Sequence, residues 1–581
     1  MSSMPGTESS VGTSSDPLEL VIIGAGPHGL ALLLRLLDDH PDESGDFFVG
    51  LGSKARAWRR TRADLGRQRC SKETAKAILK RVRVIDEGGS WLNRWDDQFQ
   101  ALEIPHLRSP SDQNPCPYDS FALQQFAAAR GRECEFVNLE PGSVPDCECC
   151  GFKGNFLLPS TALFRDFCAH LLSQYPAVAD HVTRGRVETV ERLDDDLARV
   201  VLADGTSMVA RRVVVAVGPS AAPRLPDWAP GGTTHAWDVV AARARGEEIA
   251  AAGDRVAVVG GGLTSAHLCF VAERLGCAAT LVARRERLRV SQYDLDLAWL
   301  GWRTRPGRIA KYLSGRTPPE ARLAMLAAAR RGGSVSPEAY RLLVASASRV
   351  IVDADVVSAD SVDGETWLET ADARRFGPFD RVWLATGGAP GVAGSPLFAG
   401  LLRARPVEVV GGYPRLHPSL RWELDTPIYV VGACAALALG PDALNLAGTR
   451  MSSCRVASVF RDSLRARCLR VGDTSAQEAA RTELARARRL ENLTVAYVVR
   501  SATVVVRGRP GDAAAGRRRT RVNKSVATPA ARPPRGDLAL SKADVHFIKQ
   551  GESVGVAEGL LGRQRLSALP RARFFNLAIG K

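Results

Sequence analysis

The chain lacks any apolar run long enough to cross a membrane. A spanning helix needs about 20 consecutive apolar residues, and no stretch of these 581 residues approaches that length. The first 17 residues are rich in serine and glycine and contain no hydrophobic segment, which excludes a secretory signal, and they lack the arginines of a transit peptide. We therefore expect residues 1–17 to form a disordered leader, and we expect a cytoplasmic protein without a membrane span.

The cysteines do not follow the pattern of a disulfide framework or of a zinc site. Twelve cysteines in so long a chain are few for a disulfide scaffold. Cys134, Cys147, Cys149 and Cys150 are close in sequence, but only Cys147 and Cys150 form a C-x-x-C pair. A structural zinc site would require a second such pair. Thiols in a variable loop are the simpler interpretation, and a metal at this cluster stays an open alternative.

The positive charge is large and uneven. The net charge is +15, and two basic stretches account for much of it, residues 54–83 and 507–535. Basic runs can contact nucleic acids or anionic membranes, although most are solvated surface or flexible arms. We take solvated surface as the default interpretation.

A dinucleotide-binding turn follows the first apolar strand. Residues 20–23 are apolar, and Gly24, Gly26 and Gly29 follow before an apolar helix. In such a turn the first glycine allows the sharp bend, the second lets the backbone approach a pyrophosphate, and the third lets helix and strand pack closely. The helix N-terminus then faces the phosphates.

The second strand of this unit should end in an acidic residue that binds a ribose. Residues 46–51 come soonest but end in Gly-Ser, whereas residues 81–85 end in Asp86. The second candidate has the right chemistry but lies later than the usual separation of about twenty residues. We therefore predict an insertion over residues 40–80 and assign the ribose contact to Asp86.

A second turn of the same kind begins at Gly260. Gly260, Gly262 and Ser265 take the three key positions after an apolar strand. The next strand, residues 279–283, ends in Arg284 and Arg285 instead of an acid. Guanidinium groups match a ribose 2′-phosphate, which favours NADPH over NADH. A solvated arginine pair is the alternative.

Further candidates lie in a proline-rich loop and at strand ends. The loop carries His106 and Arg108, for which a structural hydrogen bond and a contact with a flavin are equally good interpretations. The remaining candidates follow buried strands or open the last helix, where a chain passes a cofactor, and they are Gly218, Gly387, Gly432, Gly440 and Asn445.

Two such turns about 235 residues apart, with a strand that ends in Ala-Thr-Gly, resemble the two-dinucleotide-binding-domain flavoproteins. Among these, the chain resembles the class B flavin monooxygenases near the lysine and ornithine N-hydroxylases, and FAD/NAD(P)-binding oxidoreductases similar to them. The resemblance covers residues 18–460, and it is carried by residues 24–29, 104–110, 260–265, 296–301, 328–334 and 439–448.

The resemblance implies an α/β fold with two Rossmann-like domains. An FAD domain would occupy residues 18–225 and 377–473, an NAD(P)H domain would be inserted at 226–376, and a basic extension would follow at 474–581. The residues implied to bind FAD are Gly24, Gly26, Gly29 and Asp86, and those implied to bind NADPH are Gly260, Gly262, Ser265, Arg284 and Arg285. The chain departs from the pattern at Ala433 and Cys434, where many flavoproteins place an acid, and at residues 106–108, where the N-hydroxylases have a lysine-containing motif.

The implied function is that of an FAD-dependent, NADPH-using monooxygenase that acts through a flavin peroxide on a small nucleophilic substrate, with O₂. The cofactor does the difficult chemistry, so no catalytic triad is required, and we identify no catalytic residue. Two alternatives remain. One is an NAD(P)H-dependent reductase of another acceptor, and the other is a nucleotide-binding or RNA-associated protein without catalysis. RNA contact would involve the basic extension, where residues 541–551 resemble part of small RNA-binding modules of the ribosomal-protein type.

Overall fold

The computed structural model describes residues 16–38, 70–138, 157–219, 222–229, 232–300, 305–330, 332–389, 391–392 and 395–469. The chain divides into two compact units. The described part of the second unit consists of residues 298–300 and 305–317, with α12 (Arg305–Leu313) and most of α11 (Leu297–Leu300). The first unit contains both large sheets.

The first sheet has five parallel strands in the order β20-β9-β1-β2-β5. Their bounds are β1 Leu20–Ile23, β2 Val82–Asp86, β5 Val182–Arg184, β9 Val213–Val215 and β20 Ile428–Val430. The central strand β1 is at most 4% exposed at every residue. A strand covered on both faces has a continuous apolar sequence, as β1 does. Because β2 pairs with β1, the second strand of this unit is the one that ends in Asp86.

The second sheet repeats this arrangement with the order β10-β17-β11-β12-β13, again all parallel. Its strands are β10 Thr233–His235, β11 Arg255–Val259, β12 Ala278–Val282, β13 Arg349–Ile351 and β17 Arg381–Leu384. Each large sheet is accompanied by a three-stranded antiparallel sheet, which follows the edge strand in sequence. These small sheets are β6 Val187–Arg192, β7 Ala198–Leu202 and β8 Ser207–Ala210, and β14 Val356–Val362, β15 Glu365–Thr370 and β16 Arg375–Phe379.

One predicted boundary needs correction. The sequence places the return to the first domain at residue 377, but β17 pairs with β10 and β11 of the second sheet. The second domain therefore continues through Leu384. The chain rejoins the first sheet at β20, which pairs with β9.

The two connections between the domains pair with each other. The Arg224 N–H donates to Gly387 O at 2.9 Å, and the Ala389 N–H donates to Ala222 O at 2.9 Å. The outgoing and returning segments therefore run antiparallel, side by side.

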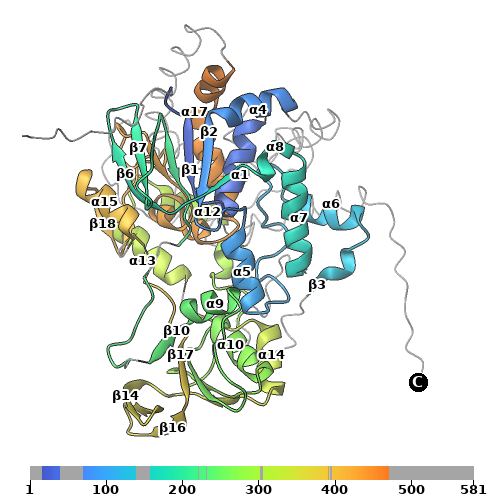
Figure 1. The fold of residues 1–581 in the computed structure, drawn as a ribbon, viewed down its shortest axis with the longest axis vertical. Helices are drawn as coiled ribbons and strands as arrows, with labels where there is room; N and C mark the ends of the chain where they lie inside the picture. The colour runs from blue at the N-terminus through green and yellow to red at the C-terminus, as the bar shows by residue number, and fades with distance from the viewer. Residues whose placement is uncertain are drawn as a thin grey trace, which may run out of the picture. The chain divides into compact units, whose positions relative to one another are not determined.

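Helices cover the sheets (Figure 1). α1 (Pro27–Leu37) begins at the N-cap Gly26 with a proline at its first position, where a missing N–H costs no hydrogen bond. It packs against α17 (Gly448–Cys468) beside the first sheet, and α10 (Leu263–Arg274) packs with α14 (Pro337–Ala345) beside the second. The predicted insertion over residues 40–80 falls largely outside the described residues, except that α4 (Lys72–Lys80) precedes β2, with the Ser71 hydroxyl capping it.

The remaining elements are shorter or peripheral. The helices are α5 Asn93–Ala101, α6 Ala122–Ala129, α7 Thr161–Ser173, α8 Pro176–Ala179, α9 Ala236–Ala244, α13 Pro319–Ala329, α15 Pro396–Ala404 and α16 Ala436–Leu439, with 3₁₀ turns η1 Glu133–Glu135, η3 Gly432–Ala435 and η4 Pro441–Leu444. Two hairpins complete the set, β3 Phe136–Asn138 with β4 Leu157–Pro159 and β18 Val409–Val410 with β19 Tyr413–Pro414.

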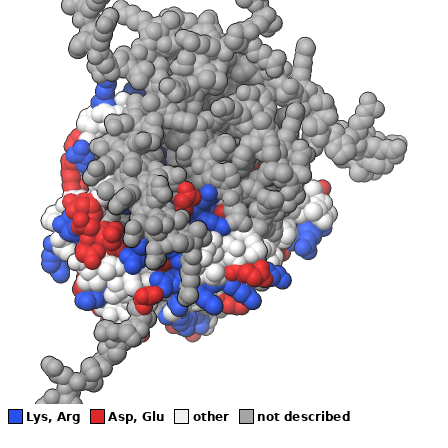
Figure 2. Space-filling model, turned by 90° about the horizontal axis from the view of Figure 1, so that it is seen from above, with Lys and Arg blue, Asp and Glu red and all other residues white. Residues whose placement is uncertain are grey.

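Several sequence predictions concern absences or fall outside the described residues. None of the described helices is both long and apolar enough to cross a bilayer. The described residues contain no group of three or more acidic, histidine or cysteine side chains suited to a metal. Of the cysteine cluster only Cys134 is described, as an exposed thiol. Residues 1–15 of the predicted leader and the whole predicted extension, 474–581, lie outside the described range. On the face in Figure 2 the described basic and acidic residues are interspersed.

Candidate functional site

The first glycine turn lies where β1 ends and α1 begins. Gly24 has φ +107°, and a Cβ there would lie 2.5 Å from Ala216 O of the neighbouring strand end. A Cβ on Gly29 would lie 2.3 Å from Gly24 O. Both positions therefore require glycine for packing alone. Gly26 differs, because a Cβ there would meet nothing within 4 Å. The space above the helix N-terminus is open at this position.

Asp86 is held beside this turn. Its Oδ2 accepts a hydrogen bond from the Ala25 N–H at 2.8 Å, and its Oδ1 accepts one from the Gly88 N–H at 2.8 Å. The carboxylate therefore lies at the carboxyl end of β2, next to the glycine turn, which is where a Rossmann unit places its ribose-binding acid.

The other residues predicted to bind FAD lie either after strands of the first sheet or just before α17. Gly218 (φ +76°) follows β9, and Gly432 (φ +74°) follows β20. Both therefore lie at the carboxyl edge that carries Gly24. Gly440 (φ +94°) links α16 to η4, and the side-chain oxygen of Asn445 accepts from the Ala447 N–H at 2.9 Å, just before α17.

Two side chains at this edge were not predicted from the sequence. His28 belongs to the glycine turn, its Nδ1 lies 3.0 Å from the Ser452 hydroxyl of α17, and a Cβ on Gly432 would lie 3.5 Å from its ring. Burial lowers the pKa of His28 to about 4, although a hydrogen bond with the Asn445 backbone partly opposes this. The Cys434 thiol donates to Gly218 O at 3.6 Å. The sequence signal that could have identified His28 is its position within the glycine motif, between Gly26 and Gly29.

The second glycine turn is packed differently. A Cβ on Gly260 would lie 2.5 Å from Ala385 O, which parallels Gly24 in the first turn. Ser265 is fully buried, and its hydroxyl donates to Gly262 O at 2.6 Å, so it bonds within the first turn of α10. A Cβ on Gly262 would lie 3.6 Å from Gly333 Cα. The second turn is therefore covered at the position where the first is open.

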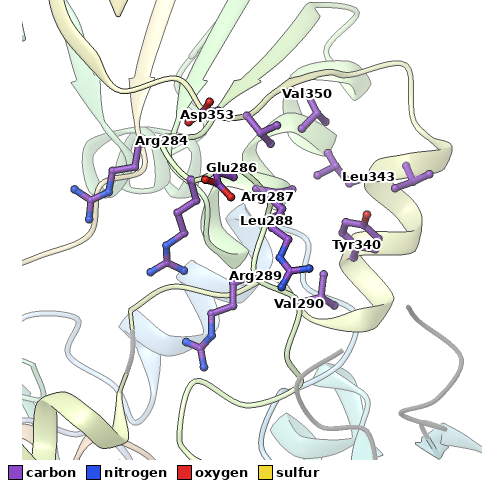
Figure 3. Close-up of a pocket in the computed structure, with 13 residues that line it drawn as sticks. Arg284, Glu286, Arg287, Leu288, Arg289, Val290, Tyr340, Leu343, Val350 and Asp353 are labelled. Atoms are coloured by element: carbon purple, nitrogen blue, oxygen red, sulfur yellow. The ribbon is translucent and has the colours of Figure 1, made fainter. Parts of the chain in front are cut away.

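A pocket of about 840 Å³ lies at the carboxyl ends of β12 and β13. One side is basic, and its arginines are Arg284, Arg285, Arg287 and Arg289. The other side is largely apolar and includes Tyr340, Leu343 and Val350. Figure 3 shows Arg284 on the side away from Tyr340 and Leu343, with Arg287 between them. Sequence reasoning named the first two arginines and missed Arg287 and Arg289, which continue the same alternating run.

Gly387, the last predicted residue, lies at the returning connection with φ +78°. Its carbonyl accepts from the Arg224 N–H at 2.9 Å and lies 3.1 Å from His235 Nε2. The bond from Arg224 joins the returning connection to the outgoing one, and His235 is the last residue of β10.

Arg108 does not face open space. Its Nε donates to Gln292 O at 2.8 Å, its Nη1 to Asp294 Oδ1 at 2.9 Å and Ser334 O at 3.2 Å, and its Nη2 to Ser291 O at 2.7 Å and the Ser334 hydroxyl at 2.8 Å. All five N–H groups of the guanidinium thus have protein acceptors.

These acceptors belong to the second domain, so Arg108 fastens the proline-rich loop of the first domain to it. Of the two interpretations of Arg108, the structural hydrogen bonds are thus present in the structure, and the flavin contact stays a prediction. Burial lowers the pKa of Arg108. For Asp294, burial acts to raise the pKa, but the charge of Arg108, the hydrogen bond from Ser334 and the charge of Arg330 together lower it.

Neighbouring residues strengthen the same junction. His106 Nδ1 lies 2.9 Å from Glu338 Oε1 of α14. The Arg243 side chain of α9 donates to Ala101 O and to Glu103. His106 therefore has the hydrogen-bonding partner that its structural interpretation requires.

The residues present suit a dinucleotide at each sheet. At the first, the Cβ position of Gly26 is empty, which leaves a cradle for a pyrophosphate, and Asp86 offers an acceptor to ribose hydroxyls. At the second, Arg284 and Arg285 follow β12 directly, and the pocket lining holds four arginines against two acids, Glu286 and Asp353, which suits a phosphorylated ribose. The donor sets of the two sites are thus complementary to FAD and to NADPH, respectively.

Comparison with known proteins agrees with this architecture. The family model described as pyridine nucleotide-disulphide oxidoreductase matches residues 111–299. No curated protein matches the chain by sequence.

Solved structures match over most of the chain. The ornithine N-hydroxylase of Kutzneria sp. 744 is 18% identical with a TM-score of 0.54, over 78% of this chain and 100% of that one. The cadaverine monooxygenase of desferrioxamine biosynthesis from Erwinia amylovora is 15% identical with a TM-score of 0.50, over 79% and 96%. The L-lysine 6-monooxygenase of Pseudomonas syringae is 17% identical with a TM-score of 0.50, over 76% and 98%. The predicted resemblance and the α/β fold with two Rossmann-like domains are confirmed.

Proposed function

We propose that the protein is an FAD- and NADPH-dependent monooxygenase of small nucleophilic substrates. The observation that carries the proposal is the opposite chemistry of the two strand ends that follow the glycine turns. An acid, Asp86, ends the strand beside the first turn, and a run of arginines from Arg284 follows the strand beside the second. This is the difference expected between a nucleotide with a free ribose and one with a 2′-phosphate.

In the first domain, the chain's residues bind and orient FAD. The α1 N-terminus and the Gly26 cradle receive the pyrophosphate, and Asp86 accepts from the adenosine ribose. Gly218 and Gly432 let the strand ends approach the ribityl and ring portions closely. Gly440 and Asn445 lie where the chain enters α17, at the far end of the flavin in this proposal.

In the second domain, Gly260 and Gly262 receive the NADPH pyrophosphate, and Ser265 keeps the helix packed close to it. Arg284 and Arg285 hold the 2′-phosphate through charge-assisted hydrogen bonds, which contribute roughly 1.5–3 kcal/mol each. We therefore expect a preference for NADPH over NADH of about tenfold or more. The double variant Arg284→Ala/Arg285→Ala should raise the KM for NADPH relative to the KM for NADH.

When bound, reduced FAD would activate O₂ and supply one oxygen atom to a nucleophile, while the protein excludes water. The similar structures belong to enzymes named for ornithine, cadaverine and lysine, which makes small amines the first class to test. The chain has His106 and Arg108 in the loop where the N-hydroxylases have a lysine-containing motif. These side chains bond to the protein here, so the amine would be recognised by other groups.

A reductase of another acceptor is the second candidate, and the matching family model favours it. None of the described cysteines forms a disulfide, and Cys147 and Cys150 lie outside the described residues. This fits our proposal of a cytoplasmic location, because oxidising compartments favour disulfides. Small-molecule substrate and O₂ are the partners we propose. RNA contact through the basic extension stays an untested prediction.

The deciding experiment uses the purified full chain. An absorbance spectrum should show bound flavin, and anaerobic NADPH should bleach it. Admission of O₂ with a panel of small amines should then yield an oxygenated product in proportion to NADPH consumed. Bleaching without any oxygenated product, but with turnover of a disulfide or quinone acceptor, would establish the reductase. A protein that binds no flavin would refute both.

A further inference from the structure

The two glycine turns differ at the position that matters most for a pyrophosphate. The second glycine of such a turn lacks a side chain because the pyrophosphate approaches along the Cβ direction. That direction is empty at Gly26, where nothing lies within 4 Å. At Gly262 it points to Gly333 Cα, 3.6 Å from the Cβ position. Gly333 therefore lies in the direction from which a pyrophosphate would approach Gly262.

The segment 332–334, which we term the covering segment, is held from both domains. The Arg289 Nη1 donates to Gly332 O at 3.0 Å, and the Arg285 Nη1 donates to Gly333 O at 3.4 Å. On the other side, Ser334 is fully buried and bonded to Arg108 and Asp294. The covering segment is thus held at Ser334 by its hydrogen bond with Arg108, and at Gly332 and Gly333 by hydrogen bonds from two arginines of the pocket.

The same arginines have two competing sets of acceptors. In this structure Arg285 and Arg289 serve backbone carbonyls of the covering segment, and both line the pocket proposed for the 2′-phosphate. A phosphate is the stronger acceptor, because it is negatively charged and can bind a guanidinium through two parallel hydrogen bonds, whereas a backbone carbonyl is neutral. A bound 2′-phosphate would therefore draw the guanidinium groups away from Gly332 and Gly333.

We infer that the covering segment closes the second dinucleotide site and that the 2′-phosphate releases it by capturing Arg285 and Arg289. This rests on the proposed function and makes Arg289 and Gly333 determinants of NADPH specificity. NADH lacks the phosphate and must displace the segment while both arginines still hold it. The apparent affinity for NADH is therefore its intrinsic affinity multiplied by the fraction of molecules in which the segment is open.

The first test is Gly333→Ala. The new Cβ would lie 3.2 Å from Gly262 Cα, so it crowds the closed position, and the backbone at Gly333 is not in the left-handed region. Weakening the closed state should tighten NADP⁺ binding about threefold or more, measured by calorimetry on the FAD-containing protein. The matched control is Gly315→Ala, where a Cβ would meet nothing within 4 Å and affinity should not change. Weaker or unchanged NADP⁺ binding in Gly333→Ala would overturn the inference.

The second test is Arg289→Ala with NAD⁺ as the probe. Loss of the bond to Gly332 should tighten NAD⁺ binding about threefold, whereas a purely phosphate-binding arginine would leave NAD⁺ unaffected and so contradict the inference. Arg245→Ala, at an exposed pair with Glu247, is the control. If neither the wild type nor Gly333→Ala binds any nicotinamide nucleotide, the proposed function fails together with the inference. If NADP⁺ binds but both variants behave as wild type, only the inference fails.

Discussion

Replacing Arg108 with methionine should loosen the junction between the domains without removing FAD. The guanidinium makes five hydrogen bonds, and three of its acceptors are the backbone carbonyl oxygens of Ser291, Gln292 and Ser334, residues that are at most 3% exposed. Leaving buried acceptors unpaired costs about 1–3 kcal/mol each. The contact with Asp294 adds less, because that side chain is 37% exposed and solvent screens it.

We expect a total destabilisation of roughly 3 kcal/mol, allowing for water entering part of the site. For a domain of this size, each kcal/mol shifts Tm by about 2–4 °C, so the loss is roughly 6–12 °C. Thermal unfolding followed by circular dichroism measures it, and flavin absorbance measures FAD retention on the same samples. Arg108→Lys should recover less than half, because an ammonium cannot reproduce the planar fork of donors.

The control is Arg245→Ala, since Arg245 and Glu247 are both more than half exposed and such pairs contribute little. Loss of flavin from Arg108→Met at an unchanged Tm would refute the reasoning, because it would mean that this arginine serves the cofactor and not the junction.

Three further predictions follow from the packing of single residues. Gly26→Val should fold, because the Cβ position of Gly26 is empty, but it should lose FAD. Gly29→Ala should unfold, because its Cβ would lie 2.3 Å from Gly24 O. Circular dichroism measures folding and flavin absorbance measures bound FAD in both variants. Burial lowers the pKa of His267 to about 4, below the ordinary value of 6.5 that it has in the unfolded chain. As the pH falls from 6.5 to 4, the unfolded chain is protonated at His267 before the folded protein is, so the fold should lose up to roughly 3 kcal/mol of stability. His267→Leu should flatten that part of the pH profile in urea unfolding. Glu19 is buried among Arg81, Arg211, Arg212 and Arg467, so Glu19→Gln should cost roughly 3 kcal/mol in the same assay.

Each of these has a contrary outcome. Full FAD occupancy in a folded Gly26→Val protein would place the pyrophosphate elsewhere. An unchanged acid limb in His267→Leu would mean that other groups cause the loss of stability. Glu19→Gln with wild-type stability would show that the four arginines tolerate one another without the carboxylate.

The local elements of the fold were predictable because each leaves a periodic or positional signal. The apolar run of β1, the glycines at 24, 26 and 29, and the acid at the end of β2 are read from neighbouring residues. The second turn at Gly260 repeats this pattern, which is why two Rossmann-like domains could be predicted. Such signals depend on backbone sterics over a few residues, and folding does not change them.

Features that depend on distant pairing were not predictable. The strand Arg381–Leu384 reads the same in either sheet, and only its pairing with β11 assigns it to the second. The partners of Arg108 lie 183–226 residues away in sequence. Gly333 belonged to a quoted motif, but its approach to Gly262 depends on how a loop folds back over a helix. No sequence pattern encodes that distance.

The paired connections at residues 222–224 and 387–389 have a consequence for the history and engineering of the chain. Because the outgoing and returning segments are hydrogen-bonded neighbours, the chain leaves the first domain and returns to it at adjacent positions. One recombination event there could have introduced the second domain without reordering the strands of the first sheet. By the same geometry, a short turn that joins Ala222 to Ala389 should excise the second domain and leave a continuous first domain for separate expression.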